Sequence, residues 1–180
     1  MTDKIPTLQT LRLNLRPFDL SDAKEVQRLA GNAMVAATTA TIPHPYPDGV
    51  AEEWISSHGK AFECGVAVDW AIEIQSSKQL IGCISFGVNK ANCRAELGYW
   101  VGEDYWNHGY CTEAARAAIN YAFITLKLNK VTSRHIAENP SSGKVMIKAG
   151  MTQEGILKKD FLKNGKFVDM VVYGILNPNV

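Results

Sequence analysis

The chain has no long apolar run, no excess of charge of either sign and few cysteines. No apolar run in its 180 residues approaches the roughly 18 residues that a helix needs to cross a bilayer. The stretch before Thr7 also lacks the apolar segment of a signal peptide. Nineteen basic residues against eighteen acidic ones give a net charge of +1 without a basic block, whereas nucleic-acid-binding proteins usually have a basic face. We therefore expect a cytoplasmic protein that has neither a membrane nor a nucleic acid as its partner.

The cysteines and histidines show no spacing that is typical of a metal site. Cys64, Cys83, Cys93 and Cys111 form no C-x-x-C pair, and no histidine stands near them at the spacing of a zinc ligand. The simplest interpretation is a set of reduced thiols in a reducing compartment. We therefore predict neither a disulfide framework nor a bound metal.

Apolar residues make up 46% of the chain, which suffices for the core of one domain, and we expect a single domain over residues 1–180. Strict alternation predicts strands, and apolar residues at helical spacing predict helices. Strands are predicted at 11–16, 66–75, 80–88, 94–101, 131–137, 151–159 and 166–176, and helices at 21–32, 48–64, 110–126 and 141–149. Ser21 and Asp48 are the expected N-caps of the first two helices, and Asn164-Gly165 predicts a hairpin. The order β-α-α-β-β-β-α-β-α-β-β indicates an α/β (α+β) fold, a mixed sheet with helices on its faces.

The stretch from Trp106 to Ala114 joins a predicted strand to a long amphipathic helix. A turn that opens a helix leaves several backbone N–H groups without an acceptor and places the positive end of the helix dipole there. Such a site suits a phosphate or pyrophosphate. The N–H groups of Asn107 to Thr112 are therefore candidates for holding a phosphorylated cofactor. On these residues alone, a turn that merely begins a helix is an equally good interpretation.

These residues resemble the pyrophosphate loop of the GNAT family of N-acetyltransferases, Gln/Arg-x-x-Gly-x-Gly/Ala, with Gly109 at the fourth place. The RimJ/RimL-like branch, which acetylates protein N-termini, is more similar, because it accepts an aromatic residue at the place of Trp106. Further matches, spread over nearly the whole chain, are Leu11-Arg12-Leu13-x-Leu15-Arg16, the proline-rich stretch 42–47, Ala95-Glu96-Leu97-Gly98-Tyr99, Asn139-x-x-Ser142 and Asn164-Gly165. Two residues depart from the family pattern: Cys111 is bulkier than the usual Gly or Ala, and Met146 replaces a tyrosine proposed as general acid.

The resemblance implies a GNAT acyl-CoA N-acyltransferase fold and acetyl-CoA as cosubstrate. It implies direct attack by a primary amine in a ternary complex, with the N-terminal α-amine of a ribosomal-type protein as the preferred acceptor, and it is compatible with a homodimer. The residues that it assigns to the cofactor are Trp106, Asn107, His108, Gly109, Tyr110, Cys111, Thr112 and Asn139. Two alternatives stay open: a small-molecule amine as acceptor, such as an amino acid, a polyamine or an antibiotic, and a non-catalytic acyl-CoA-binding module.

Glu96 is the candidate catalytic base. On an alternating strand it shares a side with Gly98 and Trp100, and apolar neighbours would raise the pKa of its carboxyl toward neutrality. The alternative is a solvated glutamate, or one paired with Arg94. An α-amine has a pKa near 8, so a fraction is already neutral at physiological pH and one water-relayed base suffices.

Ser142 is the second catalytic candidate. The resemblance implies that its hydroxyl donates a hydrogen bond to the departing thiolate. The alternative is that Ser141 or Ser142 caps the helix that begins there, and that Asn139 is only a turn residue before Pro140.

Overall fold

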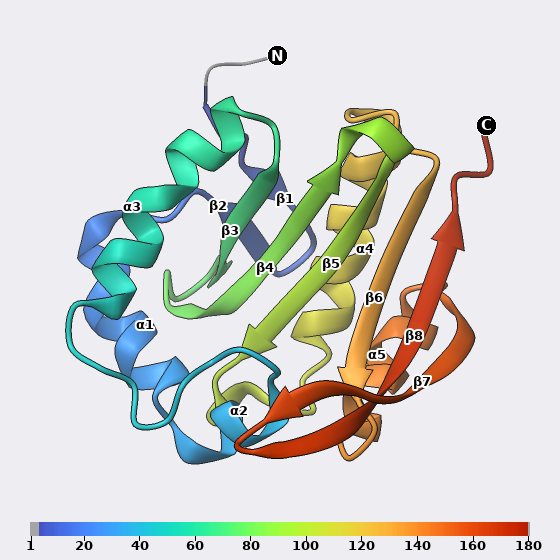
Figure 1. The fold of residues 1–180 in the computed structure, drawn as a ribbon. Helices are drawn as coiled ribbons and strands as arrows, with labels where there is room; N and C mark the ends of the chain where they lie inside the picture. Colours follow the sequence, from blue (N-terminus) through green and yellow to red (C-terminus); the bar gives the residue numbers. More distant parts are fainter. Residues whose placement is uncertain (1–3, 180) are drawn as a thin grey trace.

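The computed structural model describes residues 4–179 as one eight-stranded sheet with helices on both faces (Figure 1). The strands are β1 (Leu8–Gln9), β2 (Leu13–Arg16), β3 (Ala67–Ile74), β4 (Leu80–Asn89), β5 (Arg94–Val101), β6 (Lys130–Ile136), β7 (Thr152–Lys163) and β8 (Lys166–Leu176). The α-helices are α1 (Ala23–Ala30), α2 (Ala33–Thr38), α3 (Val50–Glu63), α4 (Tyr110–Ile124) and α5 (Pro140–Lys148), and short 3-10 turns are η1 (Leu20–Asp22), η2 (Lys90–Asn92) and η3 (Glu103–Tyr105).

The strands follow the order β1-β2-β3-β4-β5-β6-β8-β7 across the sheet. Neighbouring strands are antiparallel except β5 and β6, which are parallel because α4 crosses over between them. The predicted mixed sheet is therefore confirmed, as is the hairpin: Asn164 and Gly165 both have positive φ, and Lys163 faces Lys166 across β7 and β8.

Apart from the 3-10 turns, one short strand and one short α-helix were not predicted. β1 contains only two residues, too few for an alternation to be visible. α2 follows Asn32, whose side-chain oxygen accepts hydrogen bonds from the amides of Met34 and Val35. Asn32 was predicted to end the first helix, but it is the N-cap of the next one, since a short polar side chain with extended backbone satisfies free amides at a helix start.

The two predicted N-caps are wrong. Asp19, not Ser21, caps the chain at η1, where it forms a capping box with Asp22. The N-cap of α3 is Gly49, which has a φ of 84° and makes no side-chain cap, while the Asp48 carboxylate accepts a hydrogen bond from Gln27 at 2.6 Å. Asp48 therefore ties the loop before α3 to α1.

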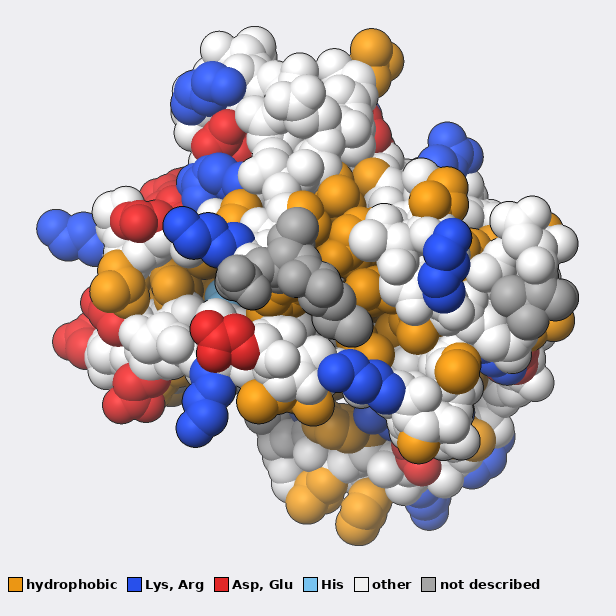
Figure 2. Space-filling view, turned by 90° about the horizontal axis from the view of Figure 1, so that it is seen from above, with side chains coloured by type: hydrophobic (Ala, Val, Ile, Leu, Met, Phe, Trp, Pro, Cys, Tyr) orange, Lys and Arg blue, Asp and Glu red, His pale blue; other side chains and the backbone are white. Residues whose placement is uncertain are grey.

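The core has a large and a small part, one on each face of the sheet. The large part packs α4 and α5 against β2 to β6, through side chains such as Trp70, Phe86 and Ala118. The small part packs α1 and α3 against the other face, around Val26 and Ala71. On the face viewed from above in Figure 2, acidic and basic side chains are interspersed around a hydrophobic centre.

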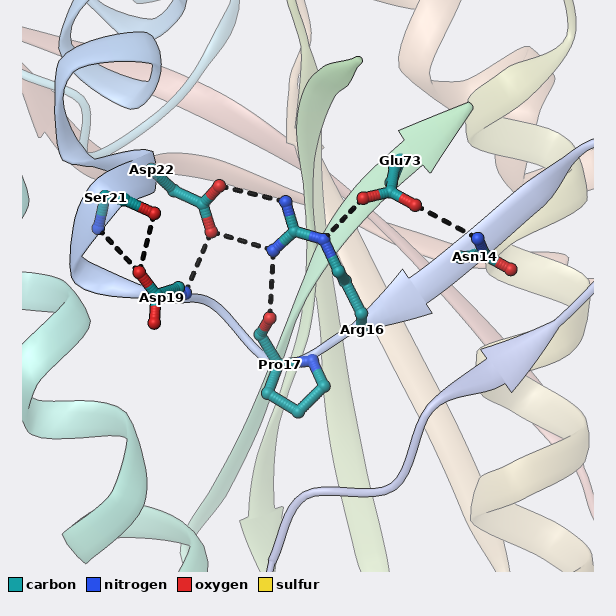
Figure 3. Close-up of polar contacts among 7 residues, drawn as sticks. All are labelled: Asn14, Arg16, Pro17, Asp19, Ser21, Asp22 and Glu73. Carbon is teal, nitrogen blue, oxygen red and sulfur yellow. Dashed lines mark hydrogen bonds and ion pairs between the residues drawn. The ribbon is translucent and has the colours of Figure 1, made fainter. Parts of the chain in front are cut away.

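Arg16 at the end of β2 joins three segments of the chain (Figure 3). Its guanidinium donates two hydrogen bonds to the Asp22 carboxylate, at 2.8 and 2.9 Å, and one to the Glu73 carboxylate at 2.7 Å. Asn14 donates to the second oxygen of Glu73 at 3.0 Å. This Arg16 network fixes η1, and with it the start of α1, against β2 and β3.

The C-terminal end of α2 is held by distant parts of the chain. The Lys163 ammonium, at the tip of the β7–β8 hairpin, donates to the carbonyls of Ala36, Ala37 and Thr39. The side-chain amide of Asn139 donates to the Thr38 carbonyl at 2.9 Å. The hairpin tip reaches α2 in Figure 1, so α2 and the loop after it lie over one end of the sheet.

His58 on α3 is a buried histidine that should lower stability in acid. It is 5% exposed, lies 4.4 Å from the Trp54 ring and 5.3 Å from Phe18, and neither ring nitrogen has a hydrogen-bond partner. Burial lowers its pKa from 6.5 to about 4. Because the unfolded chain binds this proton first, stability is present above pH 6.5 and falls as the pH drops toward 4.

We expect His58→Phe to raise the free energy of unfolding by about 1 kcal/mol at pH 7.5, since it removes unpaired buried nitrogens. The gain should grow by about 2.5 kcal/mol near pH 4.5, because the unfolded wild type binds a proton there that the variant cannot bind. Urea unfolding at the two pH values measures both. A gain that is equal at both pH values would show that His58 does not titrate as its burial indicates.

Candidate active site

A cavity of about 820 Å³ runs from the N-termini of α4 and α5, across the middle of the sheet, to α1 and α3. Of the predicted site residues, those that line it are Glu96, Trp106, Asn107, Gly109, Tyr110, Cys111, Thr112, Asn139 and Ser142. His108 is not among the lining residues. Predicted residues from three separate stretches of sequence thus meet at one cavity, as the predicted site requires.

The loop before α4 presents free amides to this cavity. Asn107 and Gly109 have φ values of 63° and 80°, and Gly109 is the N-cap without a side-chain hydrogen bond. The first hydrogen bond of the helix is from the Glu113 amide to the Gly109 carbonyl, at 3.1 Å. The amides of residues 110–112 come before it and have no acceptor in the helix. The structure therefore has the polar geometry that an anion needs at this position.

Arg12 on the far side of this loop holds it in place. Its guanidinium donates to the Glu113 carboxylate at 2.7 Å and to the His108 carbonyl at 3.0 Å, and it lies 4.7 Å from the centre of the Tyr110 ring. Glu113 is thereby turned away from the cavity and neutralised. The His108 ring stacks on Tyr110 at 5.7 Å, and its Nδ1 lies 2.7 Å from the Trp106 carbonyl. The side chain of His108 thus serves the loop itself.

β5 and β6 separate halfway along their length. They pair from Arg94 with Lys130 up to Leu97 with Ser133, and no pairing follows within the described residues. Gly98 to Val101 continue to pair with β4 on their other side. The edge that faces β6 therefore offers backbone groups to an extended ligand with amide groups of its own.

Ser142 lies at this separation, close to Tyr99 of β5. The Tyr99 hydroxyl lies 2.9 Å from the Ser142 carbonyl, to which it donates, and 2.9 Å from the Ser142 hydroxyl. Burial raises the pKa of the Tyr99 phenol, so it keeps its proton. Asn139 is the N-cap of α5 and accepts from the Ser142 amide at 3.3 Å. Capping by Ser141 or Ser142 is therefore not observed, and the Ser142 hydroxyl is not occupied by the helix.

The thiols near the cavity are unreactive at neutral pH. Burial raises the pKa of Cys111 to about 12 and that of Cys83 well above its ordinary value. A cysteine attacks as a thiolate, and neither side chain forms one near pH 7.

The surroundings predicted for Glu96 are wrong. Its side chain is 51% exposed, and its carboxylate accepts a hydrogen bond from Arg134 at 2.9 Å, not from Arg94. Parallel pairing sets Glu96 beside Thr132, so Arg134 lies two residues further along the same face of β6. Apolar neighbours therefore do not enclose this carboxylate, although it lines the cavity.

Three residues at the site were not predicted: Arg12, Tyr99 and Asp69. Arg12 and Tyr99 lie within the motifs that resemble the GNAT family, but nothing in their sequence context indicates the partners that they contact. Asp69 alternates with apolar residues on β3, which is the pattern of a residue on the solvent-facing side of a strand. In the structure this side is covered by α1 and α3, and Asp69 lines the cavity.

Neither a metal site nor a membrane span is found in the described part of the chain. Within residues 4–179, no three or more His, Cys, Asp or Glu side chains are grouped so that they could hold a metal ion. No helix there has the length and apolar character to cross a membrane.

Comparisons with known proteins agree with this fold. The family model described as acetyltransferase (GNAT) domain matches residues 12–152. The uncharacterized N-acetyltransferase YoaA of Bacillus subtilis (strain 168) is 28% identical over 174 residues, 96% of this chain and 98% of the relative. The [ribosomal protein uS5]-alanine N-acetyltransferase of Escherichia coli (strain K12) is 27% identical over 141 residues, 76% of this chain and 71% of the relative. The structure of Mycobacterium smegmatis RimJ in complex with CoA-disulfide has a TM-score of 0.86 at 20% identity, and covers 99% of this chain and 90% of RimJ.

The mixed sheet that separates between its two parallel strands is thus the fold of acyl-CoA-dependent acetyltransferases. The chain belongs to the GNAT family of N-acetyltransferases. The predicted family and fold class are confirmed, and RimJ/RimL-like proteins are among its relatives and structural neighbours.

Proposed function

We propose that the protein transfers the acetyl group of acetyl-CoA to a primary amine by direct attack, and that its acceptor is the N-terminal α-amine of a protein. The observation that carries the proposal is one continuous cavity, lined at one end by the free amides before α4 and at the other by α1, α3 and the loop between them. Both substrates can occupy such a cavity together. A covalent acyl-enzyme has no support, because the thiols there stay protonated.

The residues around the loop fit the acetyl-CoA cosubstrate. In this proposal the amides of Tyr110, Cys111 and Thr112 bind the pyrophosphate, and Trp106 and Asn107 form the wall of the cavity beside it. His108 contributes through the loop conformation. The pantetheine arm lies along Gly98 to Val101, near Asn139, and its amides pair with the free edge of β5.

Ser142 is proposed to stabilise the departing thiolate. The Tyr99 hydroxyl has one proton and donates it to the Ser142 carbonyl, so the Ser142 hydroxyl is free to turn its own proton toward the sulfur. A hydrogen bond to a charged group contributes about 1.5 kcal/mol or more, which is the scale of a tenfold change in rate.

We therefore expect Ser142→Ala to lower kcat about tenfold and to leave the KM for acetyl-CoA within about twofold. Stability should not change, because Asn139 caps the helix. Steady-state kinetics and thermal unfolding measure these effects, with Ser56→Ala on the exposed face of α3 as the control. Loss of stability, or a raised KM with kcat unchanged, would assign Ser142 a structural or binding role.

The charges of the cavity favour an α-amine over a polyamine. Among the described residues its lining has two acidic side chains, Asp69 and Glu96, and three basic ones, Arg134, Lys144 and Lys148. Arg134 neutralises Glu96 at 2.9 Å. A polyamine carries several positive charges and would need an acidic groove, whereas an N-terminus carries one. The relative that acts on alanine of ribosomal protein uS5 gives further support, and a ribosomal acceptor would place the reaction in the cytoplasm.

The test is acetyl transfer detected by mass spectrometry, with three acceptor sets: peptides with free N-termini, ribosomal proteins, and small amines that include spermidine and amino acids. The proposal predicts turnover on peptides or ribosomal proteins, with the acetyl group on the α-amine. Turnover on small amines alone would support acetyl transfer but would contradict the proposal that the acceptor is a protein N-terminus. Binding of acetyl-CoA without transfer to any of them would indicate a non-catalytic module.

A further inference from the structure

Asp69 on β3 belongs to the row of paired residues that crosses the sheet at the point where β5 separates from β6. In the register of the sheet Asp69 pairs with Ser85, and Ser85 pairs with Gly98. Residues that pair across antiparallel strands project to the same face. Gly98 is the first residue of β5 beyond its pairing with β6. Asp69, Ser85 and Gly98 therefore form a row of cavity-lining residues that runs from β3 across β4 to the point where β5 and β6 separate.

The spacing along this row suits a short proton relay. Two strand spacings put the Cα atoms of Asp69 and Gly98 roughly 10 Å apart. Gly98 has no side chain, and a Cβ there would lie 3.4 Å from the Ser85 hydroxyl oxygen. An acceptor amine above Gly98 can therefore reach Asp69 through the Ser85 hydroxyl or through one water molecule.

We propose that Asp69, and not Glu96, is the catalytic base that takes the proton from the acceptor amine. In this arrangement Ser85 lies between the amine and the Asp69 carboxylate. This inference rests on the proposed function. It concerns a residue that lies on a different strand and that no motif in the sequence indicates.

The environment of Asp69 supports this role. Burial raises the pKa of its carboxyl from 3.8 to about 6, and no hydrogen bond or charge in the described residues offsets this effect. The Cys83 thiol on β4 interacts with this carboxylate and the Tyr46 phenol lines the same cavity, and both groups are neutral near pH 7 because burial raises the pKa of each. Glu96 and Arg134 also line the cavity, but they form an ion pair on β5 and β6. Asp69 is thus a carboxylate at pH 7 and a stronger base than an exposed one.

The proton balance of the reaction closes with this assignment. The ammonium of the acceptor gives one proton to the Asp69 carboxylate, and the freed nitrogen lone pair forms a bond to the carbonyl carbon of the thioester. The carbon–sulfur bond then breaks, its electron pair goes to sulfur, and the second proton of the nitrogen passes to the thiolate by way of the Ser142 hydroxyl. Asp69 releases its proton to water before the next turnover, so one proton is released for each amide formed.

The assignment also separates α-amines from lysine side chains. Transfer from an α-ammonium with a pKa near 8 to Asp69 is unfavourable by about 10²-fold, but transfer from a lysine with a pKa near 10.4 is unfavourable by about 10⁴-fold. We therefore expect the enzyme to acetylate the N-terminus of a peptide that also contains lysine, and to leave the lysine unmodified.

Asp69→Asn tests the proposal through the pH dependence of kcat with a peptide acceptor. The wild-type kcat should rise through about pH 6 and become flat above pH 7. The variant should be about tenfold slower at pH 7 and approach the wild type toward pH 9, where more of the amine is neutral without a base. Glu63→Gln, on the exposed end of α3, is the matched control, and Glu96→Gln is measured beside it.

Thermal unfolding separates catalysis from folding. The Asp69→Asn variant should be at least as stable as the wild type at pH 8, because it removes a charge whose burial is unfavourable. An Asp69→Asn variant with the wild-type kcat from pH 6 to 9, or a pH-dependent loss found in Glu96→Gln instead, would overturn the inference and leave the proposed function intact. A wild-type protein that acetylates no amine would overturn both.

Discussion

A valine at position 109 is expected to weaken the binding of acetyl-CoA by about 10- to 100-fold. Gly109 has a φ of 80° at the N-cap of α4, a conformation that a β-branched residue adopts only with strain of about 1–3 kcal/mol. A Cβ there would meet only the Arg12 guanidinium, at 3.5 Å, which is an ordinary contact. The loss therefore arises from the backbone, which relaxes and turns the amides of the loop away from the phosphates.

Isothermal titration calorimetry with acetyl-CoA measures this loss, and Gly165→Val provides the matched control. Gly165 has a φ of 76°, and a Cβ there would meet nothing within 4 Å, so the same strain arises at the hairpin tip, outside the cavity lining. Both variants should lose similar stability, but only Gly109→Val should lose affinity. Equal affinities in the two variants would remove the loop before α4 as the cofactor site.

Local patterns predicted most of the fold, because its strands and long helices each satisfy a rule within a few residues. Alternation around Trp70 located β3, and Asn164-Gly165 located the last hairpin. α2 was not predicted, because its six residues contain less than two turns of helical pattern. The N-caps were predicted wrongly for a different reason. Ser21 and Asp48 are good capping residues, but the Asp19 side chain forms the capping box with Asp22 at η1, and Gly49 holds the N-cap of α3 through its left-handed backbone.

The candidate site likewise contains features that the local sequence predicts and features that depend on distant residues. The amides before α4 follow from one turn at the start of a helix, so the sequence predicted them. The surroundings of Glu96 depend on Arg134, which lies 38 positions away and reaches it through the parallel pairing of β5 with β6. The position of Asp69 in the cavity depends on which face of β3 the helices cover and on the register of three strands. Contacts of this kind are set by the assembled sheet, and no pattern within a single strand contains them.

Replacement of Arg16 by methionine should lower the free energy of unfolding by about 3 kcal/mol. Arg16 is 25% exposed and the carboxylates of Asp22 and Glu73 are each 11% exposed, so its loss leaves two poorly solvated negative charges near one another (Figure 3). For a protein of this size the melting temperature should fall by about 6–12 °C. Arg28→Met is the control: its ion pair with Glu25 is on the surface, its side chain is 56% exposed, and its loss should cost less than about 1 kcal/mol.

The pH dependence of this loss identifies its cause. Desolvation acts to raise the pKa of Glu73, but the hydrogen bonds from Arg16 and Asn14 and the nearby positive charges outweigh it and lower the pKa below 4.5. A carboxyl with a lowered pKa stabilises the fold above its unfolded value, and this contribution disappears as the pH falls through the folded value. The difference between wild type and Arg16→Met should therefore be largest at pH 7 and shrink below about pH 4.

Removal of the two carboxylates that Arg16→Met leaves without a partner guanidinium should restore part of the stability. Arg16→Met combined with Glu73→Gln and Asp22→Asn replaces both carboxylates by neutral groups, and we expect the triple variant to recover about half of the loss. Since Arg16 fixes the start of α1, and Val26 and Ala30 of that helix line the cavity, the single variant should also raise the KM for the acceptor more than the KM for acetyl-CoA. A loss of stability that persists at low pH, or that the triple variant does not reduce, would mean that Arg16 acts through packing of its aliphatic chain and not through charge.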